Sequence, residues 1–373
     1  MNILYVCNYY HRAMIFRDSM NYLEARGHNV KVFNAVVKNA KVDEKYRTIM
    51  DEKVIHRECF SSNDRFIFPL KQWKIKKAID CAINYKEIDV IHSHTLFNGG
   101  WATRSISKEK GIPYVVTVRN TDMNDYLPLP GFKLLARIIV RDAAQIQFLS
   151  EAYRQAFIEK CFPNERNYVM DKSAVITNGL EPFWLDNIWL KERSVCGKKV
   201  NLLCVGKIDS NKNMKAVLEA AGILEKRGFI PKVTIIGQVV DQQIESEIRN
   251  YSGVEVLPFM KKEELIEYYR AADIYVMPSF TESFGRVYAE AMTQGLPVIY
   301  TRGQGFDGQF SDGLVGYAVS PTDYEQIADC IVRIYDNYEV IHKNCVKLCI
   351  HYDWKQIAES LETMYEKAVT GKD

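Results

Sequence analysis

Short apolar runs alternate with amphipathic stretches along most of the chain. The runs at 2–6, 114–118 and 201–205 are dominated by aliphatic and aromatic residues and are bounded by polar ones. Continuous apolar runs of this length are typical of strands that are buried on both faces of a parallel sheet. Between them, apolar residues recur every three or four positions, as on the buried face of an amphipathic helix. The pattern predicts an α/β protein with parallel sheets.

The N-terminal half is expected to form one Rossmann-like unit, because it begins as strand, helix and strand. These first elements are predicted at 2–6, 15–26 and 29–33. Further strands are predicted at 88–93, 114–118, 145–149 and 172–177, and further helices at 101–110, 127–140 and 151–160. The polar segment 38–62 has no clear period, so loops and short elements are expected there.

The C-terminal half repeats this alternation after a charged, irregular segment at 185–199. Strands are predicted at 201–205, 233–236, 254–257, 274–277 and 296–300. Helices are predicted at 214–226, 263–271, 284–294, 322–335, 340–350 and 354–368. We therefore predict an N-terminal domain at 1–190 and a C-terminal domain at 191–353, which is an ordinary size for two domains.

Composition narrows the class of protein. The chain has 373 residues, of which 47% are hydrophobic and 26% are charged, so a packed core is expected. A formal net charge of +2 argues against a general binder of polyanions, and no nucleic-acid partner is expected. Nine cysteines without a Cys-x-x-Cys pair indicate a reducing compartment and argue against a disulfide framework or a zinc site.

Membrane and targeting signals are weak. No apolar run approaches the roughly 20 residues needed to cross a bilayer, and the N-terminus lacks the basic region of a signal peptide. We expect a cytoplasmic protein that is soluble or at most peripheral at the inner face of a membrane. The basic helix predicted at 65–83 has an apolar face that can lie on an anionic membrane. Alternatively, it is a core helix whose lysines extend to water.

The stretch FTESFGRVYAEAMTQG at 280–295 carries the strongest chemical signal. Ser283 is placed to cap a helix, and Gly285 leaves backbone N–H groups open to a phosphate at the positive helix end. Glu282 and Glu290 lie on either side of this helix start, where their carboxylates can accept hydrogen bonds from a sugar and from a ribose. A bound nucleotide sugar would fit this arrangement, although an amphipathic helix with two solvated glutamates has the same spacing.

Two cations support the nucleotide-sugar interpretation. Lys207 and Lys212 lie in the turn GKIDSNKN, which directly follows the strand predicted at 201–205. Cations at such a turn can converge on one diphosphate and neutralise the charge that develops as the sugar bond breaks. Lysine lacks the two-pronged geometry of arginine, so Lys207 is expected to hold the phosphate less directionally.

The stretch 280–295, with IYVMPSF before it and GLPVIYT after it, resembles the Glu, seven residues, Glu signature of the retaining GT-B glycosyltransferases of family 4, or group 1. The Lys207–Lys212 turn and the run DVIHSHTLFNGGWATRSISKEKGIPYVVTV are similar to other parts of this family. The resemblance implies two Rossmann-like domains facing across a cleft, with the C-terminal helix at 354–373 crossing back to the N-terminal domain. The N-terminal domain would bind the acceptor, and the C-terminal domain would bind the donor.

The family resemblance also implies a reaction. A sugar would move, with retention, from a nucleoside diphosphate donor, most commonly UDP, to an acceptor hydroxyl. Glu282 would orient the donor sugar, Glu290 the ribose, and the two lysines the leaving phosphate. Beyond the donor itself no cofactor is implied, and the chain contains no Asp-x-Asp, so no metal site is expected.

The resemblance assigns further residues to the donor. Ser283, Phe284 and Gly285 would contact it at the helix start. Gly237 ends a predicted strand at a loop that can face the donor. Phe259 and Met260 occupy the place where the family's backbone commonly meets the nucleotide base.

The acceptor side departs from the family pattern. The family generally carries a histidine after the strand at 114–118, and this chain has Arg119 there. Arg119 can pair with the donor diphosphate or with an anionic acceptor group. Asp122 matches the family pattern and could bind an acceptor hydroxyl, and His94 lies at a neighbouring strand end, where a structural role is equally compatible with its position.

The loop after the first strand, CNYYHRAMIFRDS, lacks the glycine pair that the family usually has. His11, Arg12 or Arg17 can supply charge to a phosphate in its place, or they can be ordinary surface residues. The acceptor is expected to be a sugar or a lipid-linked oligosaccharide of polysaccharide or glycolipid assembly. Two other functions stay open: a nucleotide-sugar 2-epimerase of the same fold, and a non-catalytic nucleotide-sugar-binding subunit.

Overall fold

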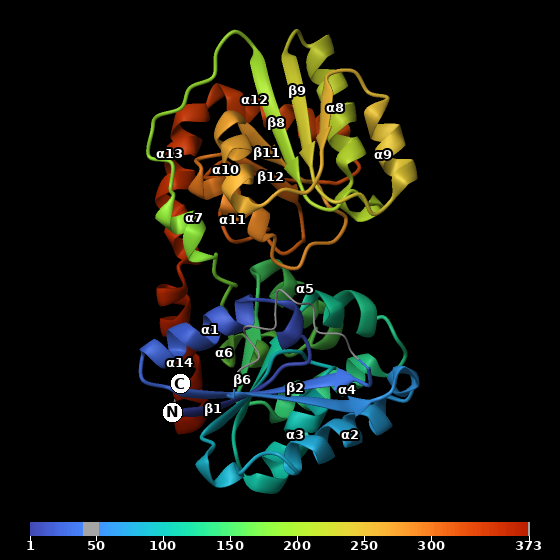
Figure 1. Ribbon diagram of the computed structural model, residues 1–373, viewed down its shortest axis with the longest axis vertical. Helices are drawn as coiled ribbons and strands as arrows, with labels where there is room; N and C mark the ends of the chain where they lie inside the picture. The colour runs from blue at the N-terminus through green and yellow to red at the C-terminus, as the bar shows by residue number, and fades with distance from the viewer. Residues whose placement is uncertain (40–51, 372–373) are drawn as a thin grey trace. The chain divides into compact units, whose positions relative to one another are not determined.

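The computed structural model describes residues 1–39 and 52–371 of the chain. It divides into two compact units. The first contains residues 1–149, 153–179 and 354–373, and the second contains residues 150–152 and 180–353. In each unit, helices flank a sheet whose strands run side by side (Figure 1). The α/β class predicted from the sequence is confirmed.

The first unit is built on a seven-stranded parallel sheet in the order β3-β2-β1-β4-β5-β6-β7. Its strands are β1 (Asn2–Val6), β2 (Asn29–Val37), β3 (Val54–Phe60), β4 (Val90–Ser93), β5 (Tyr114–Val118), β6 (Gln145–Phe148) and β7 (Ser173–Val175). Its helices are α1 (Ile15–Ala25), α2 (Phe68–Asp80), α3 (Gly100–Lys110), α4 (Phe132–Asp142), α5 (Glu151–Cys161), α6 (Arg166–Asp171) and α14 (Trp354–Thr370).

The C-terminal helix α14 belongs to the first unit, as predicted. Together with α1 it covers one face of the sheet, where Leu361 and Tyr365 share a buried apolar cluster with Ile3 and Tyr5 of β1. The opposite face of the sheet packs against α2, α3, α4 and α5 in a separate cluster. Both sheet faces are therefore covered, which explains why the strands read as continuous apolar runs.

The second unit is built on a six-stranded parallel sheet in the order β10-β9-β8-β11-β12-β13. Its strands are β8 (Lys199–Val205), β9 (Ile230–Ile236), β10 (Val254–Leu257), β11 (Ile274–Val276), β12 (Val298–Thr301) and β13 (Gly316–Val319). Its helices are α7 (Pro182–Asp186), α8 (Met214–Lys226), α9 (Gln242–Arg249), α10 (Lys262–Ala271), α11 (Arg286–Thr293), α12 (Tyr324–Asp336) and α13 (Tyr338–Leu348).

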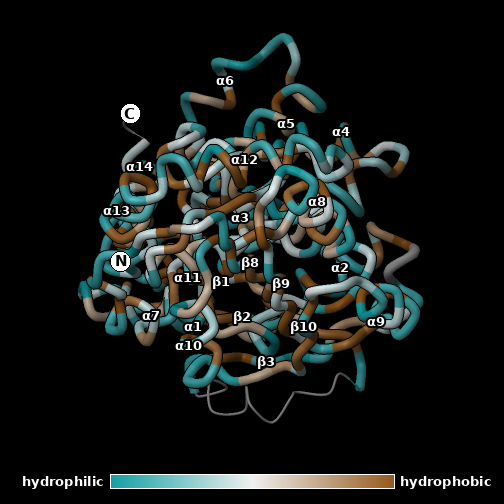
Figure 2. The backbone as a smooth tube through the Cα atoms, turned by 90° about the horizontal axis from the view of Figure 1, so that it is seen from above, coloured by the Kyte–Doolittle hydropathy of each residue, from teal (hydrophilic) through white to brown (hydrophobic). Residues whose placement is uncertain are grey.

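Hydropathy follows this architecture. In Figure 2 much of the central strands is hydrophobic, whereas the surface helix α9 is largely hydrophilic. Within each sheet the strand order reverses once, between β1 and β4 in the first unit and between β8 and β11 in the second. Ligands of open parallel sheets bind beside the carboxyl ends of the strands at such a reversal, so these two places locate the candidate sites.

Three sequence expectations need correction. The segment 38–62, for which loops and short elements were expected, contains the seven-residue strand β3, while its residues 40–51 lie outside the described residues. This strand lies at the edge of the sheet, and its exposed polar positions hide its period. The division between units falls after Gly179 rather than after residue 190. Trp184 of α7 explains this shift, because its buried ring packs edge-on against Tyr269 in the second core, with centroids 5.4 Å apart. The basic helix predicted at 65–83 is limited to α2, and the side chains of Arg65 and Phe66 lie outside the described residues.

Candidate functional site

The strand reversal of the second unit brings two predicted residues into direct contact. Lys212 follows β8 and Glu282 follows β11, its neighbour in the sheet. The Lys212 Nζ lies 2.6 Å from a Glu282 carboxylate oxygen, and the two side chains are only 19% and 14% exposed. A pair in this half-buried position is stronger than an exposed surface ion pair, because less water screens it. Lys207, on the same turn, is exposed.

Asn211 ties the two loops together. Its side-chain oxygen accepts hydrogen bonds from the Thr281 backbone N–H at 3.0 Å and from the Thr281 hydroxyl at 2.8 Å. Its own carbonyl oxygen accepts a bond from the Phe280 N–H at 2.8 Å. The Asp209 carboxylate accepts the Lys212 N–H at 3.0 Å and so fixes the turn. Lys212 and Glu282 are thus held together by backbone bonds as well as by their charges.

The loop after β12 supports Glu282 from the other side. The Gln304 side-chain oxygen accepts the Glu282 N–H at 3.0 Å, and the Gly305 N–H donates to the Glu282 carbonyl at 2.9 Å. The sequence analysis assigned no role to Gln304 or Asn211. Both act on backbone groups of a segment distant in sequence, for which a local motif leaves no signature.

Helix α11 begins later than predicted, which corrects the role of Ser283. Gly285 is the N-cap residue with φ of +76°, and a Cβ there would lie 2.3 Å from the Tyr288 ring. This left-handed conformation favours glycine and starts the helix at Arg286. No side chain caps the helix, so Ser283 does not do so; its N–H instead donates to the Glu282 carboxylate at 3.2 Å.

Glu290 lies about one turn after the start of α11 and is half-buried. Burial raises the pKa of its carboxyl, while the positive charge of Arg286 opposes the rise. The hydroxyl of Tyr269, which is fully buried, lies 3.5 Å from one carboxylate oxygen. A desolvated carboxylate with few partners gains most from accepting hydroxyl hydrogen bonds, as a ribose would supply.

The remaining residues assigned to the donor fall into different environments. Phe284 is buried, with its ring edge-on to Tyr352 at 5.6 Å, so only its backbone is available to a ligand. Phe259, after β10, is 73% exposed, and Met260 is half-buried. Gly237 lies where a Cβ would be 1.7 Å from the Gly206 carbonyl oxygen, so a close backbone approach of the β8 and β9 ends requires it.

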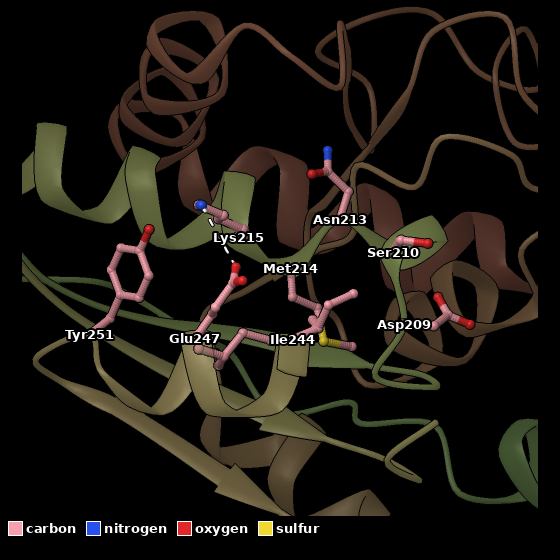
Figure 3. Close-up of a pocket in the computed structure, with 9 residues that line it drawn as sticks. Asp209, Ser210, Asn213, Met214, Lys215, Ile244, Glu247 and Tyr251 are labelled. Atoms are coloured by element: carbon pink, nitrogen blue, oxygen red, sulfur yellow. Dashed lines mark ion pairs between the residues drawn. The ribbon is translucent and has the colours of Figure 1, made fainter. Parts of the chain in front are cut away.

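A pocket of about 180 Å³ lies beside the Lys212 turn, between the start of α8 and helix α9. Figure 3 shows Lys215 and Glu247 facing each other across it, with an ion pair of 3.9 Å. Met214 and Ile244 supply apolar walls. None of the residues predicted to bind the donor lines this pocket.

The strand reversal of the first unit places His94 and Arg119 together on a small cavity of about 20 Å³, enough for about one water. His94 is 4% exposed, stacks on His92 with centroids 4.0 Å apart, and has no hydrogen-bond partner for either ring nitrogen among the described residues. Burial, followed by the charges of His92 and Arg119, lowers its pKa well below the ordinary value. The imidazole is therefore neutral at physiological pH.

His92 differs from His94 although the two rings stack. One ring nitrogen lies 2.7 Å from the Tyr365 hydroxyl of α14, and the other lies 2.7 Å from the Thr117 hydroxyl. Both nitrogens are thus occupied within the core of the unit. These contacts give His92 a structural role.

Arg119 is oriented by its neighbours. Its Nε donates to the His94 carbonyl oxygen at 2.7 Å, and its guanidinium lies 4.9 Å from the centre of the Phe16 ring. The guanidinium thereby stays close to the end of β4. Arginine in this position keeps its charge, which suits the anion-binding role predicted from the sequence.

Asp122 is completely buried. Its carboxylate accepts backbone N–H bonds from Leu96 at 3.1 Å, Phe97 at 3.0 Å and Arg119 at 2.9 Å. Burial raises its pKa to about 6, against the opposing effect of these bonds. Asp122 therefore connects the loop after β4 to the loop after β5, and its burial does not support the predicted bond to an acceptor hydroxyl.

Other candidate features are few. Within residues 1–39 and 52–371, no three histidine, cysteine or acidic side chains gather in a way that could hold a metal ion. The same residues contain no helix with the length and apolarity needed to cross a bilayer. The nine cysteines have free thiols in the structure.

Two parallel α/β units, one with a lysine–carboxylate pair at its strand reversal, are the architecture of GT-B enzymes that use nucleotide sugars. Comparison with known families agrees. The profile for "Glycosyl transferases group 1" matches residues 189–347, and that for "Glycosyltransferase Family 4" matches residues 15–182. The chain belongs to the group 1 glycosyltransferases of the GT-B fold.

Individual relatives give the same picture. The chain is 31% identical over 195 residues to D-inositol 3-phosphate glycosyltransferase of Paenarthrobacter aurescens, an alignment that spans 48% of each protein and so only about half of this relative. It is 26% identical to alpha-monoglucosyldiacylglycerol synthase of Acholeplasma laidlawii, over 92% of this chain and 90% of that protein. The solved structure of HepE from Anabaena with UDP and glucose superposes with a TM-score of 0.67 at 16% identity, covering 98% of this chain and all of the other.

Proposed function

We propose that the protein is a retaining glycosyltransferase that moves a sugar from a nucleoside diphosphate donor to an acceptor hydroxyl, with UDP as the nucleotide. The observation that carries this proposal is the half-buried pair of Lys212 and Glu282 at the strand reversal of the second unit. The membership of the group 1 glycosyltransferases supports it. So does the solved structure of HepE, which shares the fold and holds UDP and glucose.

In this proposal the two lysines act on the leaving group. Lys212 and Lys207 neutralise the diphosphate in the bound donor and the additional charge that develops as the sugar bond breaks. The acceptor hydroxyl attacks on the face from which the diphosphate departs, and a departing phosphate oxygen takes the acceptor proton. The N-terminus of α11, open at Gly285, adds backbone N–H groups to the same anion.

The two glutamates orient the donor. Glu282 accepts hydrogen bonds from the sugar hydroxyls while Lys212 holds its carboxylate in place. Glu290 accepts bonds from the ribose hydroxyls, and its partial desolvation makes those bonds stronger than in water. In this proposal the lysines provide the positive charge, so no metal or further cofactor takes part.

The acceptor is proposed to be a sugar or lipid-linked molecule of glycolipid or polysaccharide assembly, in line with the relative named as a glucosyldiacylglycerol synthase. The first unit carries apolar side chains suited to a peripheral membrane contact. Trp73 of α2 and Leu134 of α4 are 56% and 62% exposed, and the Lys77 ammonium lies 5.2 Å from the Trp73 ring centre. The starts of the two helices meet where the Phe68 and Phe132 rings lie 5.2 Å apart.

The test is donor binding and hydrolysis across a panel of nucleotide sugars, with EDTA present, for the wild type and Glu290→Ala. One preferred donor, lost in the variant and indifferent to EDTA, is the expected result. If no nucleotide sugar binds, or if Glu290→Ala binds as the wild type does, the proposal fails. A donor that binds and is epimerised without an acceptor would instead establish the epimerase alternative.

A further inference from the structure

A second polar pocket lies in the first unit, at the carboxyl ends of β1, β2 and β3. Its volume is about 110 Å³, and one side is formed by Asn8, His11 and Arg12 of the glycine-free loop that departs from the family pattern. Lys71 of α2 and Asn98 of the loop after β4 also line it, and the Asn8 amide donates to the Asn98 carbonyl oxygen at 2.8 Å. A water molecule takes up about 30 Å³ of liquid, so the pocket has room for a group larger than one water.

Lys71 is the unusual member of this pocket. It is 7% exposed, although lysines of a basic surface helix normally extend to water. Its Nζ donates to the Asn98 side-chain oxygen at 2.7 Å and lies 4.9 Å from the centre of the Phe60 ring. Neither partner is a carboxylate, and no ion pair of Lys71 occurs within the described part of the chain. Burial lowers its pKa to about 8, so most molecules still carry the charge at neutral pH.

Asn98 does not require this lysine. The Tyr126 hydroxyl donates to the same side-chain oxygen of Asn98 at 2.8 Å. The amide would therefore keep a partner if Lys71 were apolar. A buried ammonium without a counter-charge lowers stability, so its presence is explained better by a ligand than by the fold.

The glycine-free loop supplies further donors. His11 is 3% exposed, one of its ring nitrogens lies 3.2 Å from the Asn34 amide nitrogen, and its Nε2 has no hydrogen-bond partner among the described residues. Burial lowers the pKa of the imidazole, so it is neutral. Nδ1 also lies 3.4 Å from the Asn34 side-chain oxygen, so both tautomers of the ring are compatible with Asn34. In the tautomer in which Nδ1 accepts from the Asn34 amide, Nε2 carries the proton and is an open donor. Arg12 is exposed at the rim of the pocket.

We propose that this pocket binds a phosphate group carried by the acceptor, so that the glycosyl acceptor is a phosphorylated sugar or polyol or a phospholipid head group. The inference rests on the proposed function, since it names the acceptor of that reaction. The Lys71 ammonium lines the pocket from α2, and the His11 imidazole and the Arg12 guanidinium line it from the loop after β1, which suits the several oxygens of a phosphate. The phosphate then supplies the counter-charge that Lys71 lacks.

Isothermal titration calorimetry with matched ligands tests the proposal in the full chain. Glucose 6-phosphate is compared with glucose, and inorganic phosphate serves as a competitor. Phosphatidylcholine vesicles with and without phosphatidic acid, assayed by co-sedimentation, form the lipid arm. We expect at least about tenfold preference for the phosphorylated member of one pair, as one charge-assisted contact provides. The preferred arm then identifies a soluble or a lipid phosphate.

Two variants locate the preference. Lys71→Met is expected to abolish it, whereas Lys86→Met, at an exposed lysine of the first unit to which no binding role is assigned, is expected to leave it unchanged. Circular dichroism and thermal unfolding establish that each variant is folded. If Lys71→Met does not fold, His11→Ala carries the same expectation, because it removes the Nε2 donor.

Failure of this inference is distinct from failure of the proposed function. UDP binding is measured on the same samples and concerns residues of the second unit only. If UDP binds but neither pair shows a phosphate preference, or if Lys86→Met loses the preference as Lys71→Met does, the inference is overturned and the transferase proposal stands. If the phosphate preference is present and no nucleotide binds, the pocket is an anion site and the assignment to an acceptor is overturned.

Discussion

The charged side chains near the strand reversals of the two units differ in whether the protein itself neutralises them. In the second unit, Lys212 and Glu282 neutralise each other, and Asn211 and Gln304 fix the loops that carry them. In the first unit, Lys71 lacks a carboxylate partner and His94 has open ring nitrogens within the described residues. In the second unit a carboxylate of the protein itself neutralises the cation. In the first unit the ammonium and the ring nitrogens depend on a ligand for a counter-charge or a hydrogen-bond partner.

The largest effect is expected from removing the cation of the Lys212–Glu282 pair. Lys212→Ala should reduce donor turnover by about 10³-fold, because it deletes a positive charge beside the leaving diphosphate and removes the ion pair that holds the Glu282 carboxylate. Steady-state hydrolysis of the preferred nucleotide sugar measures it. Lys226→Ala, at the exposed end of α8, is the matched control and should retain wild-type turnover. A Lys212→Ala rate within a few-fold of the wild type would show that the pair does not act on the donor.

The second-largest effect is expected on stability, from a substitution where the backbones of β8 and β9 approach each other closely. Gly237→Ala should lower the free energy of unfolding by about 3 kcal/mol, because its Cβ would overlap the Gly206 carbonyl. Gly222→Ala in α8, where a Cβ meets nothing within 4 Å, should raise it by up to about 1 kcal/mol. Urea unfolding of both variants measures the contrast. Equal effects would mean that the close approach of β8 and β9 is not required.

The buried carboxylate of the first unit predicts a pH dependence. Because the pKa of Asp122 is raised to about 6 from an ordinary 3.8, the folded protein takes up a proton before the unfolded chain does. This group therefore lowers stability above pH 6, and the penalty is relieved as the pH falls toward 4, by about 2 kcal/mol. The difference in unfolding free energy between the wild type and Asp122→Asn, measured by urea unfolding from pH 4 to 7, should follow that change. A difference that stays constant with pH would contradict the prediction.

The smallest effect concerns the unpaired cation. Lys71→Met should raise the melting temperature by about 2–4 °C, since it removes the cost of a buried charge while Tyr126 still serves Asn98. Differential scanning calorimetry without ligand measures it, with Lys77→Met as the unchanged control. A clear decrease for Lys71→Met alone would show that the lysine stabilises the fold, and that the contrast between the two units is smaller than described.

The sequence predicted the elements and candidate site residues of the second unit more completely than those of the first. Helix α8 occurs at the predicted residues, and Lys212, Glu282 and Glu290 were found because each lies in a local motif after a strand. Strand β3 was missed because it lies at the edge of the sheet and its middle residues Arg57 and Glu58 are polar and exposed, which interrupts the apolar pattern. The roles of these residues in catalysis and donor binding stay predictions.

Contacts between distant segments explain the remaining misses. Asn211 acts on the backbone of Thr281, and no local pattern reports such a partner. Lys71 resembles any other lysine of a basic helix until Asn98 and Phe60 are placed around it. The capping role of Ser283 failed for a smaller reason, because the left-handed Gly285 sets the helix start instead.

The position of α14 also sets an order for biosynthesis. Tyr365 contacts the Tyr5 hydroxyl at 3.3 Å and the His92 ring at 2.7 Å, so the first strand of the sheet has partners near the other end of the chain. During translation the second unit, whose core lies within residues 180–353, emerges before α14 does. Contacts between segments this far apart are slow to form, because a large loop must close first. The first unit is therefore the first to leave the ribosome and the last to complete its core.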